Sequence, residues 1–386
     1  MERQSLNFRP TAPLTNLVKR AKLLQKIRSY FDSRGFIEVQ TPVLSQDTVV
    51  DSFIDPLTVS VDILGQTQTY YLQTSPEFAM KRLIASGMTA IYQITPAFRK
   101  GDRGNLHNIE FSLLEWYQIG KNYQEGRQFL IDLIQNIFND ETFQKILAHE
   151  AECSLELNRS LLFEKENRSA QTHFEVQQRS FGQVFLNETG LDPHQATRND
   201  FLAFADSVHL NYPDSFLDEK SPADENDWID LIFSSIVQPR LSQGIDGTQP
   251  FSAVVLYDYP ASQSQLAQTR TVLPSRSSEF AKRSDSFNKS VTVSERFELF
   301  VNGIELANGY HELCDSSVLR YRIQKTLKNR LLNGFPSLPS ESRLLAAMDS
   351  GLPDCCGCAL GLDRLLMVLL NASSIDEVLT FPIELA

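Results

Sequence analysis

The stretch FRKGDRGNLHNIEFSLLEWY, residues 98–117, decides how the rest of the chain is interpreted. It opens with Arg99 at the end of a strand-like segment, passes through a charged, glycine-containing turn and becomes strand-like again near Asn108. A period of two then places four side chains on one strand face: Phe111, Leu113, Glu115 and Tyr117. Such a face can stack a base on its phenyl ring and position a polar substrate with its carboxylate and hydroxyl. On its own, however, a hairpin with a charged tip and mixed burial is the better explanation.

The neighbouring segments predict a mixture of helices and strands. Apolar residues at three- and four-residue spacing indicate an amphipathic helix over 14–34, ended by Gly35. Alternating segments at 36–44 and 90–100 indicate strands, and Pro42 ends the first or puts it at a sheet edge. Further helices are expected over 121–138 and 315–333. Strands and helices are interspersed, and no GxGxxG follows the first strand. We therefore predict an α+β fold and not a doubly wound parallel sheet.

Two polar stretches interrupt this pattern. Residues from about 140 to 178 are charged with weak helical periodicity, and residues 269–294 are rich in Ser, Arg and Lys. Both are typical of surface insertions, and the second is typical of a mobile loop. The expectation is a single domain over 1–386 that carries these two insertions.

The composition is that of an ordinary globular protein. Hydrophobic residues make up 42% and charged residues 22% of the chain. A net charge of -12 lowers the expectation of a tRNA or DNA partner, because phosphate binding usually depends on excess Lys and Arg. No segment approaches the roughly 20 apolar residues of a membrane span, and the N-terminus lacks a signal-peptide core. Five cysteines suit reduced thiols better than disulfides. A cytoplasmic location without membrane contact is expected.

The segment GIELANGYHEL, residues 303–313, carries a second set of polar residues. Asn308-Gly309 between apolar runs is a strong signal for a two-residue hairpin loop. That loop would pair Glu305 with Glu312, and like charges opposed on a ladder are destabilising unless a cation bridges them. Mg²⁺ with a phosphate-bearing substrate is the usual occupant of such a site. A solvated hairpin with two weakly repelling glutamates explains this segment alone about equally well.

The segment GCALGLDRLLMVLL predicts a strand that enters an apolar helix. Gly357, Ala359 and Gly361 would leave one strand face nearly bare, as a closely approaching ligand or backbone requires. Arg364 at the helix start could meet a phosphate. The alternative is a tight packing turn with Asp363 as the helix cap.

The segment TSPEF, residues 74–78, predicts another helix start. Ser75 is a preferred cap, Pro76 suits the first helical position and Glu77 suits the first turn. Capping is the plain explanation. The functional explanation is a hydroxyl and a carboxylate at a pocket rim, suited to binding an amine.

Together and in this order, these segments resemble the catalytic domain of class II aminoacyl-tRNA synthetases, in the lysyl branch. SYFDSRGFIEVQTPVL, residues 29–44, is similar to the first motif of that family, which forms its dimer interface. Residues 98–117 are similar to the second motif and residues 357–370 to the third. The resemblance covers nearly the whole chain apart from the insertions. It implies a homodimer and a mostly antiparallel sheet flanked by helices. No OB-fold domain is expected, because the motifs begin close to the N-terminus.

Within that branch, the chain most resembles free-standing paralogues that modify a protein instead of tRNA. YPASQSQLAQ, residues 259–268, is similar to them, and Ala359 stands where the tRNA-charging enzymes usually have glycine. The resemblance implies a ligase that activates lysine or (R)-β-lysine with ATP and Mg²⁺ as an aminoacyl-adenylate. The acceptor implied is a lysine side chain of elongation factor P, and no tRNA is expected. The alternatives are a truncated lysyl-tRNA synthetase-like enzyme and a non-catalytic amino-acid sensor.

The resemblance also assigns roles to individual residues. Catalysis falls to Arg99, Glu305 and Arg364, with adenine between the Phe111 ring and the Arg364 guanidinium. The implied ATP contacts are Arg99, Lys100, Gly101, Asn108, Phe111, Glu305, Leu306, Gly361 and Arg364. The implied substrate contacts are Ser75, Pro76, Glu77, Tyr117, Glu312 and Ala359. The implied metal ligands are Glu305 and Glu312.

One position departs from the family pattern. The second motif normally reads Arg-x-Glu, but here Arg99 is followed by Lys100 and Gly101, with Asp102 one place later. Either Asp102 takes over the contact of the glutamate, or the backbone does, or activity is weakened.

Overall fold

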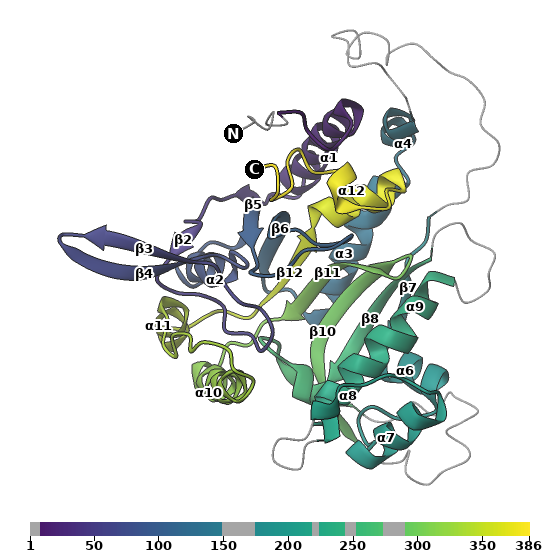
Figure 1. The fold of residues 1–386 in the computed structure, drawn as a ribbon. Coiled ribbons are helices and arrows are strands. Elements are labelled where there is room, and N and C mark those ends of the chain that lie inside the picture. Colours follow the sequence, from purple (N-terminus) through teal and green to yellow (C-terminus); the bar gives the residue numbers. More distant parts are fainter. Residues whose placement is uncertain (1–7, 149–173, 218–223, 244–251, 273–289) are drawn as a thin grey trace, which may run out of the picture. The chain divides into compact units, whose positions relative to one another are not determined.

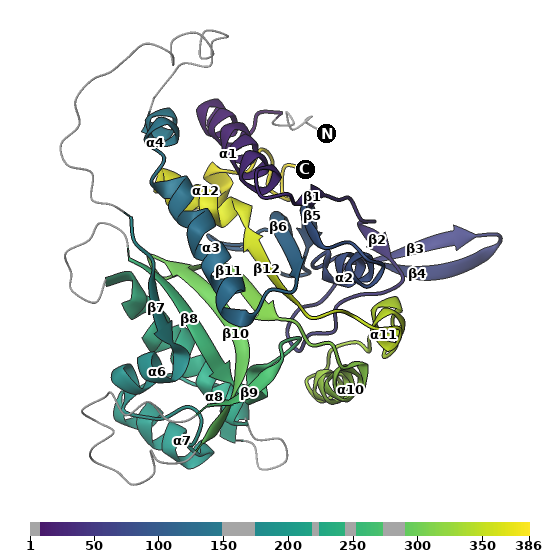
Figure 2. The same cartoon turned by 180° about the vertical axis from the view of Figure 1, so that it is seen from behind.

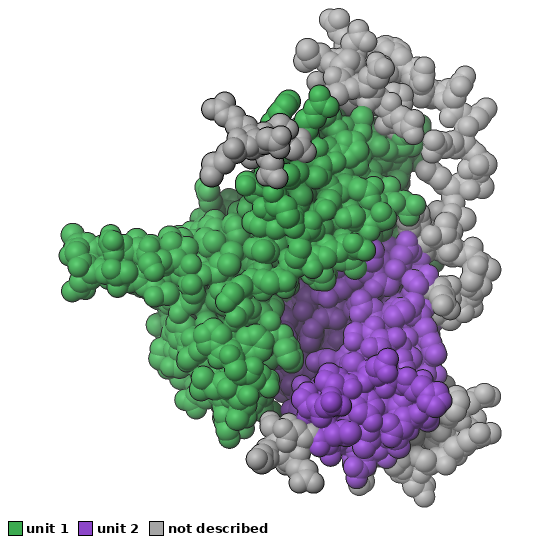
Figure 3. All heavy atoms as spheres, in the orientation of Figure 1, with its two compact units in different colours: residues 1–175, 314–386 green, residues 176–313 purple. Residues whose placement is uncertain are grey.

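The computed structural model describes five stretches of the chain: residues 8–148, 174–217, 224–243, 252–272 and 290–386 (Figure 1, and seen from behind in Figure 2). The chain divides into two compact units (Figure 3). Unit 1 comprises Met1–Glu175 and Cys314–Ala386, and unit 2 comprises Val176–Leu313. The central parts of both predicted insertions, residues 149–173 and 273–289, lie outside the described residues.

In the described part of unit 1, strands pair in the order β1-β5-β6-β12. Their bounds are β1 (Ile37–Glu38), β5 (Ala90–Phe98), β6 (Glu110–Ile119) and β12 (Cys355–Gly361). A separate antiparallel sheet contains β2 (Leu44–Ser45), β3 (Thr58–Ile63) and β4 (Gln66–Leu72). The helices are α1 (Leu14–Asp32), α2 (Glu77–Ala85), α3 (Tyr123–Phe138), α4 (Glu141–Ala148), α10 (Ser316–Leu332), α11 (Arg343–Asp349) and α12 (Leu362–Leu370), with a 3₁₀ turn at η7 (Ile375–Glu377).

Local sequence signals explain how these elements form and pack. Helix α3 begins with a capping box in which the side chains of Asn122 and Glu125 each accept a hydrogen bond from the backbone N–H of the other. The ring of Phe31 in α1 stacks on that of Tyr92 in β5, with 4.6 Å between ring centroids. Helix α3 lies against β12, and α12 lies against β6 (Figure 2). This packing fixes β6 and β12, the two strands that carry the predicted site residues Phe111, Tyr117, Ala359 and Gly361.

In the described part of unit 2, strands pair in the order β11-β10-β8-β7, and β9 also pairs with β10. Their bounds are β7 (Gln177–Ser180), β8 (Ala253–Pro260), β9 (Thr269–Val272), β10 (Val291–Val301) and β11 (Ile304–His311). The helices are α6 (Phe181–Thr189), α7 (Arg198–Ser207), α8 (Glu225–Ile232) and α9 (Gln238–Arg240). A π-helical turn, η2 (Phe233–Val237), and the 3₁₀ turns η1 (Asp214–Leu217), η3 (Leu241–Gln243) and η4 (Ala261–Gln263) complete the set.

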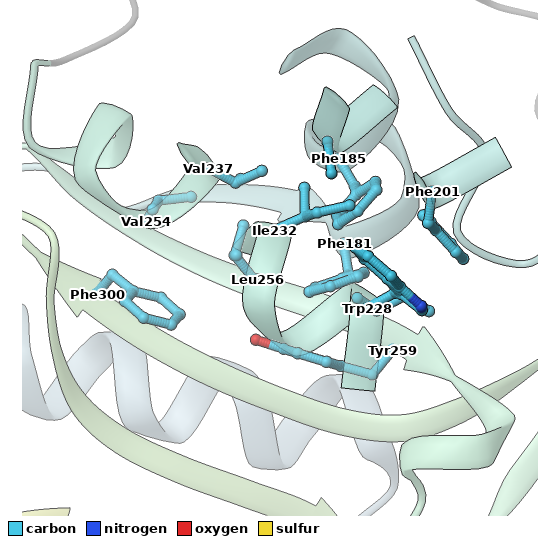
Figure 4. Packing of buried hydrophobic residues seen from close by; sticks show 12 residues of the cluster. Phe181, Phe185, Phe201, Trp228, Ile232, Val237, Val254, Leu256, Tyr259 and Phe300 are labelled. Carbon is cyan, nitrogen blue, oxygen red and sulfur yellow. The ribbon is translucent and has the colours of Figure 1, made fainter. Parts of the chain in front are cut away.

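An aromatic core holds unit 2 together (Figure 4). Phe181, Phe185 and Trp228 come from helices α6 and α8, and all three are at most 2% exposed. They gather against Tyr259 and Phe300 from the strands. Burial of such large rings is the main stabilising contribution that a small unit has available.

The hairpin predicted at Asn308-Gly309 is wrong. The turn lies at Asn302-Gly303, where both residues have positive φ, 52° and 76°, as a type I′ turn requires. Asn308 instead lies inside β11 and pairs with Glu298 of β10. Both Asn-Gly pairs fit the turn signal. The earlier one leaves a long apolar strand on each side, whereas the later one would leave only a short return strand before α10.

The strand expected over 36–44 is reduced to β1 and β2, of two residues each, and α2 begins at Glu77 with Pro76 as its N-cap, one position earlier than the first helical position expected for it. Three other helix expectations and the fold class agree with the structure. The predicted helices over 14–34, 121–138 and 315–333 correspond to α1, α3 and α10. The α+β class with a mostly antiparallel sheet is confirmed, because within the described part of each unit most strand pairs are antiparallel, and β1–β5 and β7–β8 are the parallel ones. Within the described residues, no helix combines the length and the apolar character that crossing a membrane demands.

Candidate active site

A buried carboxylate forms the centre of the predicted substrate residues in unit 1. Glu115 of β6 is 1% exposed. The Ser75 hydroxyl donates to one of its carboxylate oxygens at 2.8 Å, and the Tyr117 hydroxyl donates to the other at 2.6 Å. On the neighbouring strand, Ala359 lies opposite Glu115 and Gly357 lies opposite Tyr117. Small residues therefore stand beside this carboxylate, as the nearly bare strand face predicted.

The surroundings of Glu115 favour its protonated form when no cation is bound. Burial and the negative charge of Glu77 raise its pKa to about 8, although the hydrogen bonds from Tyr117 and Ser75 oppose the shift. Glu77 itself binds Lys81 at 2.5 Å, one helical turn away, and both side chains are largely buried. A substrate ammonium group could replace the proton on Glu115. The sequence analysis considered Glu115 for positioning a polar substrate but did not include it among the substrate contacts implied by the resemblance, and it did not single out Lys81.

Arg99 and Phe111 lie together at the loop end of the β5–β6 hairpin. The guanidinium carbon of Arg99 is 5.0 Å from the centre of the Phe111 ring, within the range of a cation–π contact. The backbone N–H of Arg99 donates to Ile109 O at 3.0 Å, which fixes the strand end. The next residue, Lys100, donates its backbone N–H to Asp55 O at 2.9 Å. The predicted ATP residues of this segment are thus anchored through their backbone on two sides.

Gly101 adopts a conformation that favours glycine. Its φ of +84° lies in the left-handed region, and a side chain there would meet no other atom within 4 Å. A glutamate at this position would therefore strain the backbone, but its side chain would not clash with neighbouring atoms. Asp102 follows in the same turn, and its charge acts on the His107 ring. Asp102 thus lies near the ring that contacts Arg364.

Arg364 in the first turn of α12 is held by the same loop. Its Nε donates to Leu106 O at 3.2 Å, and its terminal nitrogen lies 2.6 Å from His107 Nε2. Burial and the charge of Arg364 lower the pKa of His107, so a neutral ring can accept this hydrogen bond. The sequence analysis did not single out His107. Its position at the end of the Gly104–His107 turn and beside Arg364 becomes visible only in the folded chain.

Asp363 does not cap α12, whose N-cap residue is Gly361. Its carboxylate accepts from the backbone N–H of Ser112 at 2.7 Å and pairs with Arg20 of α1 at 2.5 Å. Because it is 2% exposed, this junction fixes the start of α12 against β6 and α1. The orientation of Arg364, the next residue, follows from that junction.

A second group of charged residues lies on β10 and β11 in unit 2. Glu298 is buried, forms an ion pair with Arg296, and accepts a hydrogen bond from the Tyr259 hydroxyl at 2.5 Å. Burial raises the pKa of Glu298, and the charge of Glu305 raises it further, although Arg296 opposes both. Glu298 and Glu305 are therefore the two carboxylates that act on each other across this hairpin. The sequence analysis missed Glu298.

In a regular strand, residues an odd number of positions apart lie on opposite faces. A β-bulge reverses this for Glu305 and the residues that follow Leu306. Phe300 pairs with Glu305 but Leu299 pairs with Ala307, so Leu306 is the extra residue. Beyond the bulge, alternation places Asn308 on the face of Glu305, and Glu312 follows at the same period. The two predicted metal ligands, Glu305 and Glu312, thus share a strand face because of the bulge, and not because a hairpin turn lies between them.

Metal binding by these residues would need help from a ligand. Among the described residues, no group of three or more His, Cys, Asp or Glu side chains could hold a metal ion. Mg²⁺, however, usually binds through one or two carboxylates together with substrate phosphates. Glu298 and Glu305 fit that pattern, with Arg296 neutralising Glu298 in their present arrangement.

Comparison with known proteins gives consistent matches over the whole length. The family model for class II tRNA synthetases of the D, K and N type matches residues 1–385. The chain is 34% identical to the elongation factor P–(R)-β-lysine ligase of Hamiltonella defensa, over 99% of both chains. It is 35% identical to the ligase of that name from Mannheimia succiniciproducens and 34% identical to that from Yersinia pestis, over 98% of both chains in each case.

Proposed function

Because the chain belongs to the class II tRNA synthetase family, we propose that it is an ATP-dependent ligase that activates (R)-β-lysine or lysine and transfers it to a lysine side chain of elongation factor P. The single observation that carries this proposal is the full-length similarity to ligases of that name. The buried carboxylate group around Glu115 agrees with it, because a substrate with two ammonium groups requires such partners.

In the first step, a carboxylate oxygen of the amino acid attacks the α-phosphorus of ATP. The bond from that phosphorus to the bridging oxygen breaks, and pyrophosphate leaves. Arg99 is positioned to offset the charge that builds at phosphorus, since its backbone is anchored and its guanidinium lies at the strand end. Arg364, held by Leu106 and His107, is the second candidate for contact with the nucleotide. No side chain needs to form a covalent bond.

The ammonium groups of the substrate are assigned to the carboxylate group in unit 1. Ser75 and Tyr117 fix the orientation of Glu115, and Lys81 does the same for Glu77. Binding a cation beside Glu115 favours loss of its proton, so the charged pair forms only when substrate is present. Ala359 opposite Glu115 narrows the space by one methyl group relative to glycine, a difference that suits discrimination between lysine isomers.

Mg²⁺, when bound, would supply positive charge to the phosphates as pyrophosphate leaves. Glu305 and Glu298 are the proposed ligands, and Glu312 remains a candidate for the metal or for a substrate ammonium group.

In the second step, the neutral ε-amine of the acceptor lysine attacks the adenylate carbonyl. An amide bond forms, AMP leaves with the electron pair of the broken C–O bond, and the amine proton passes to solvent or to the departing phosphate. The net reaction consumes ATP and releases AMP and pyrophosphate.

Two assays on the purified protein test this function. ATP–pyrophosphate exchange, measured with (R)-β-lysine, its S enantiomer and lysine, reports activation alone. Transfer of labelled amino acid to purified elongation factor P or to tRNA reports the acceptor. Exchange with label on elongation factor P is the expected result. Label on tRNA would support the truncated tRNA-charging enzyme, and exchange with none of the three amino acids would remove the ligase.

A further inference from the structure

Helix α10 (Ser316–Leu332) carries apolar side chains on two opposite faces. Its inner face packs Leu319 and Ile323 into unit 1, where they are 3% and 4% exposed. Its outer face presents Tyr321, Leu331 and Leu332, which are 69%, 61% and 65% exposed. A helix on the surface of a protein normally has a polar outer face, and clustered apolar side chains there are typical of a binding surface.

The same helix concentrates positive charge in an acidic chain. Its 17 residues include five Lys or Arg and no Asp or Glu, whereas the whole chain has 36 basic and 48 acidic residues. Arg320 pairs with Glu341 and Asp349. Lys325 and Lys328 are exposed, and neither makes an ion pair or hydrogen bond within the described ranges. At 100° per residue they lie on either side of Tyr321 and Leu332, on the same helix face.

Contacts made by the inner face of α10 link this helix to the predicted ATP loop. Arg330, opposite Tyr321 on the helix, is fully buried and donates to Asp51 O at 2.8 Å and Ile54 O at 3.2 Å, and it pairs with the Asp55 carboxylate. The carbonyl of Asp55 in turn accepts from the backbone N–H of Lys100 at 2.9 Å. The end of α10 is therefore two contacts away from the residue that follows Arg99.

We propose that Tyr321, Lys325, Lys328, Leu331 and Leu332, named the α10 outer face, form the docking surface for the protein acceptor of the ligase. This inference rests on the proposed function. The part of the acceptor that docks carries carboxylates for the two lysines and an apolar side chain for the space between Tyr321 and Leu332. Contact at this face holds the acceptor next to the loop that activates the amino acid.

Charge and position favour this occupant. A second copy of the chain has a net charge of -12 but also carries its own basic α10. Its charge therefore does not single out one patch that complements the α10 outer face. Nucleic acid would meet the two lysines but gain little from three exposed apolar side chains at a helix surface. An acidic protein segment with an apolar residue satisfies both features at once, and the second step of the reaction requires a protein there.

Kinetics can separate docking from activation, because pyrophosphate exchange does not involve the acceptor. The test compares wild type with the double variant Lys325→Glu/Lys328→Glu, using (R)-β-lysine and purified elongation factor P. We expect exchange within twofold of wild type and at least about a tenfold rise in the KM for elongation factor P, since charge reversal replaces two attractions with repulsions. Tyr321→Ala should raise that KM as well. The KM of wild type should increase with salt, and that of the charge-reversed variant should not.

A matched control carries the same change in net charge at other exposed positions, Lys145→Glu/Arg179→Glu. An equal rise in KM for this control would overturn the proposal, because only overall charge would then matter. An unchanged KM for elongation factor P in Lys325→Glu/Lys328→Glu would overturn it too. A change in the number of associated chains in this variant, measured as molar mass in solution, would also overturn it, because the face would then be an interface between copies. If wild type exchanges pyrophosphate but does not label elongation factor P, the proposed function fails instead.

Discussion

Glu115 is the residue whose chemistry depends most on its surroundings. It is buried, accepts hydrogen bonds from Ser75 and Tyr117, and lies within the field of Glu77, so its pKa rises to about 8. If the ammonium of the substrate replaces its proton, binding should strengthen as pH rises toward 8. Substitution Glu115→Gln keeps the shape, removes this dependence and should lower kcat/KM for the amino acid about a hundredfold in pyrophosphate exchange, as loss of a charged hydrogen bond implies. A pH profile with the same slope in wild type and variant would contradict this role.

The same residue makes a prediction about stability without substrate. A carboxyl whose pKa is raised by folding stabilises the folded state below its ordinary pKa, near 4.3, and loses that contribution as pH rises through about 8. The free energy of unfolding of wild type should therefore decrease between about pH 5 and pH 8 relative to Glu115→Gln. Urea unfolding of both proteins across this range measures the difference, which should exceed about 1 kcal/mol, the value of one pKa unit. Parallel curves would show that Glu115 titrates normally.

Gly101 tests the one departure from the family motif. Substituting Gly101→Glu restores the family residue but places a side chain at a φ of +84°, which costs about 1 kcal/mol or more. We expect lower stability and no gain in exchange activity. Gly101→Ala imposes the same backbone strain without a carboxylate and is the matched control. Higher activity in Gly101→Glu than in both wild type and Gly101→Ala would show that the missing glutamate limits this enzyme.

At the scale of elements, the buried end of α10 should control the loop beside Arg99. Arg330→Met leaves the Asp55 carboxylate and two backbone carbonyls without their donor, and breaking a buried charge pair costs about 3–5 kcal/mol. Because Asp55 O anchors Lys100, the KM for ATP in exchange should rise more than the KM for the amino acid. Urea unfolding and exchange kinetics measure the two effects. Arg330→Lys, which keeps the charge, should recover part of both, whereas equal rises in both KM values would indicate a general structural role.

Elements were more predictable from the sequence than the contacts between them. The apolar period of α1 and the capping signals of α3 are local, and both helices formed where the pattern indicated. The hairpin of β10 and β11 could not be placed from Asn308-Gly309, because Asn302-Gly303 carries the same signal and only strand pairing selects between them. The electrostatic interaction of Glu298 with Glu305 on this hairpin was hidden for the same reason. By contrast, the Glu77–Lys81 pair was readable as an i, i+4 pair on a predicted helix.

At the scale of the whole molecule, exposed apolar residues on the first motif predict self-association. Ile37 of β1 and Leu44 of β2 are 56% and 37% exposed. β1 is a strand of two residues at the end of its sheet order, and its backbone edge is available to another strand. This agrees with the homodimer that the first motif implied. A subunit interface would cover these exposed apolar side chains.

The corresponding measurement is the molar mass in solution by light scattering. Wild type should give twice the chain mass of 43.8 kDa. Ile37→Glu places a charge at the centre of the proposed interface and should shift the equilibrium toward the single chain. Leu64→Glu changes a residue that is 100% exposed at the tip of the β3–β4 hairpin, so it serves as the control that alters charge and surface hydrophobicity equally. A single-chain mass for wild type, or the same loss of dimer in both variants, would exclude the first motif as the interface. Pyrophosphate exchange at protein concentrations above and below the dissociation midpoint would then show whether pairing of subunits is needed for activation.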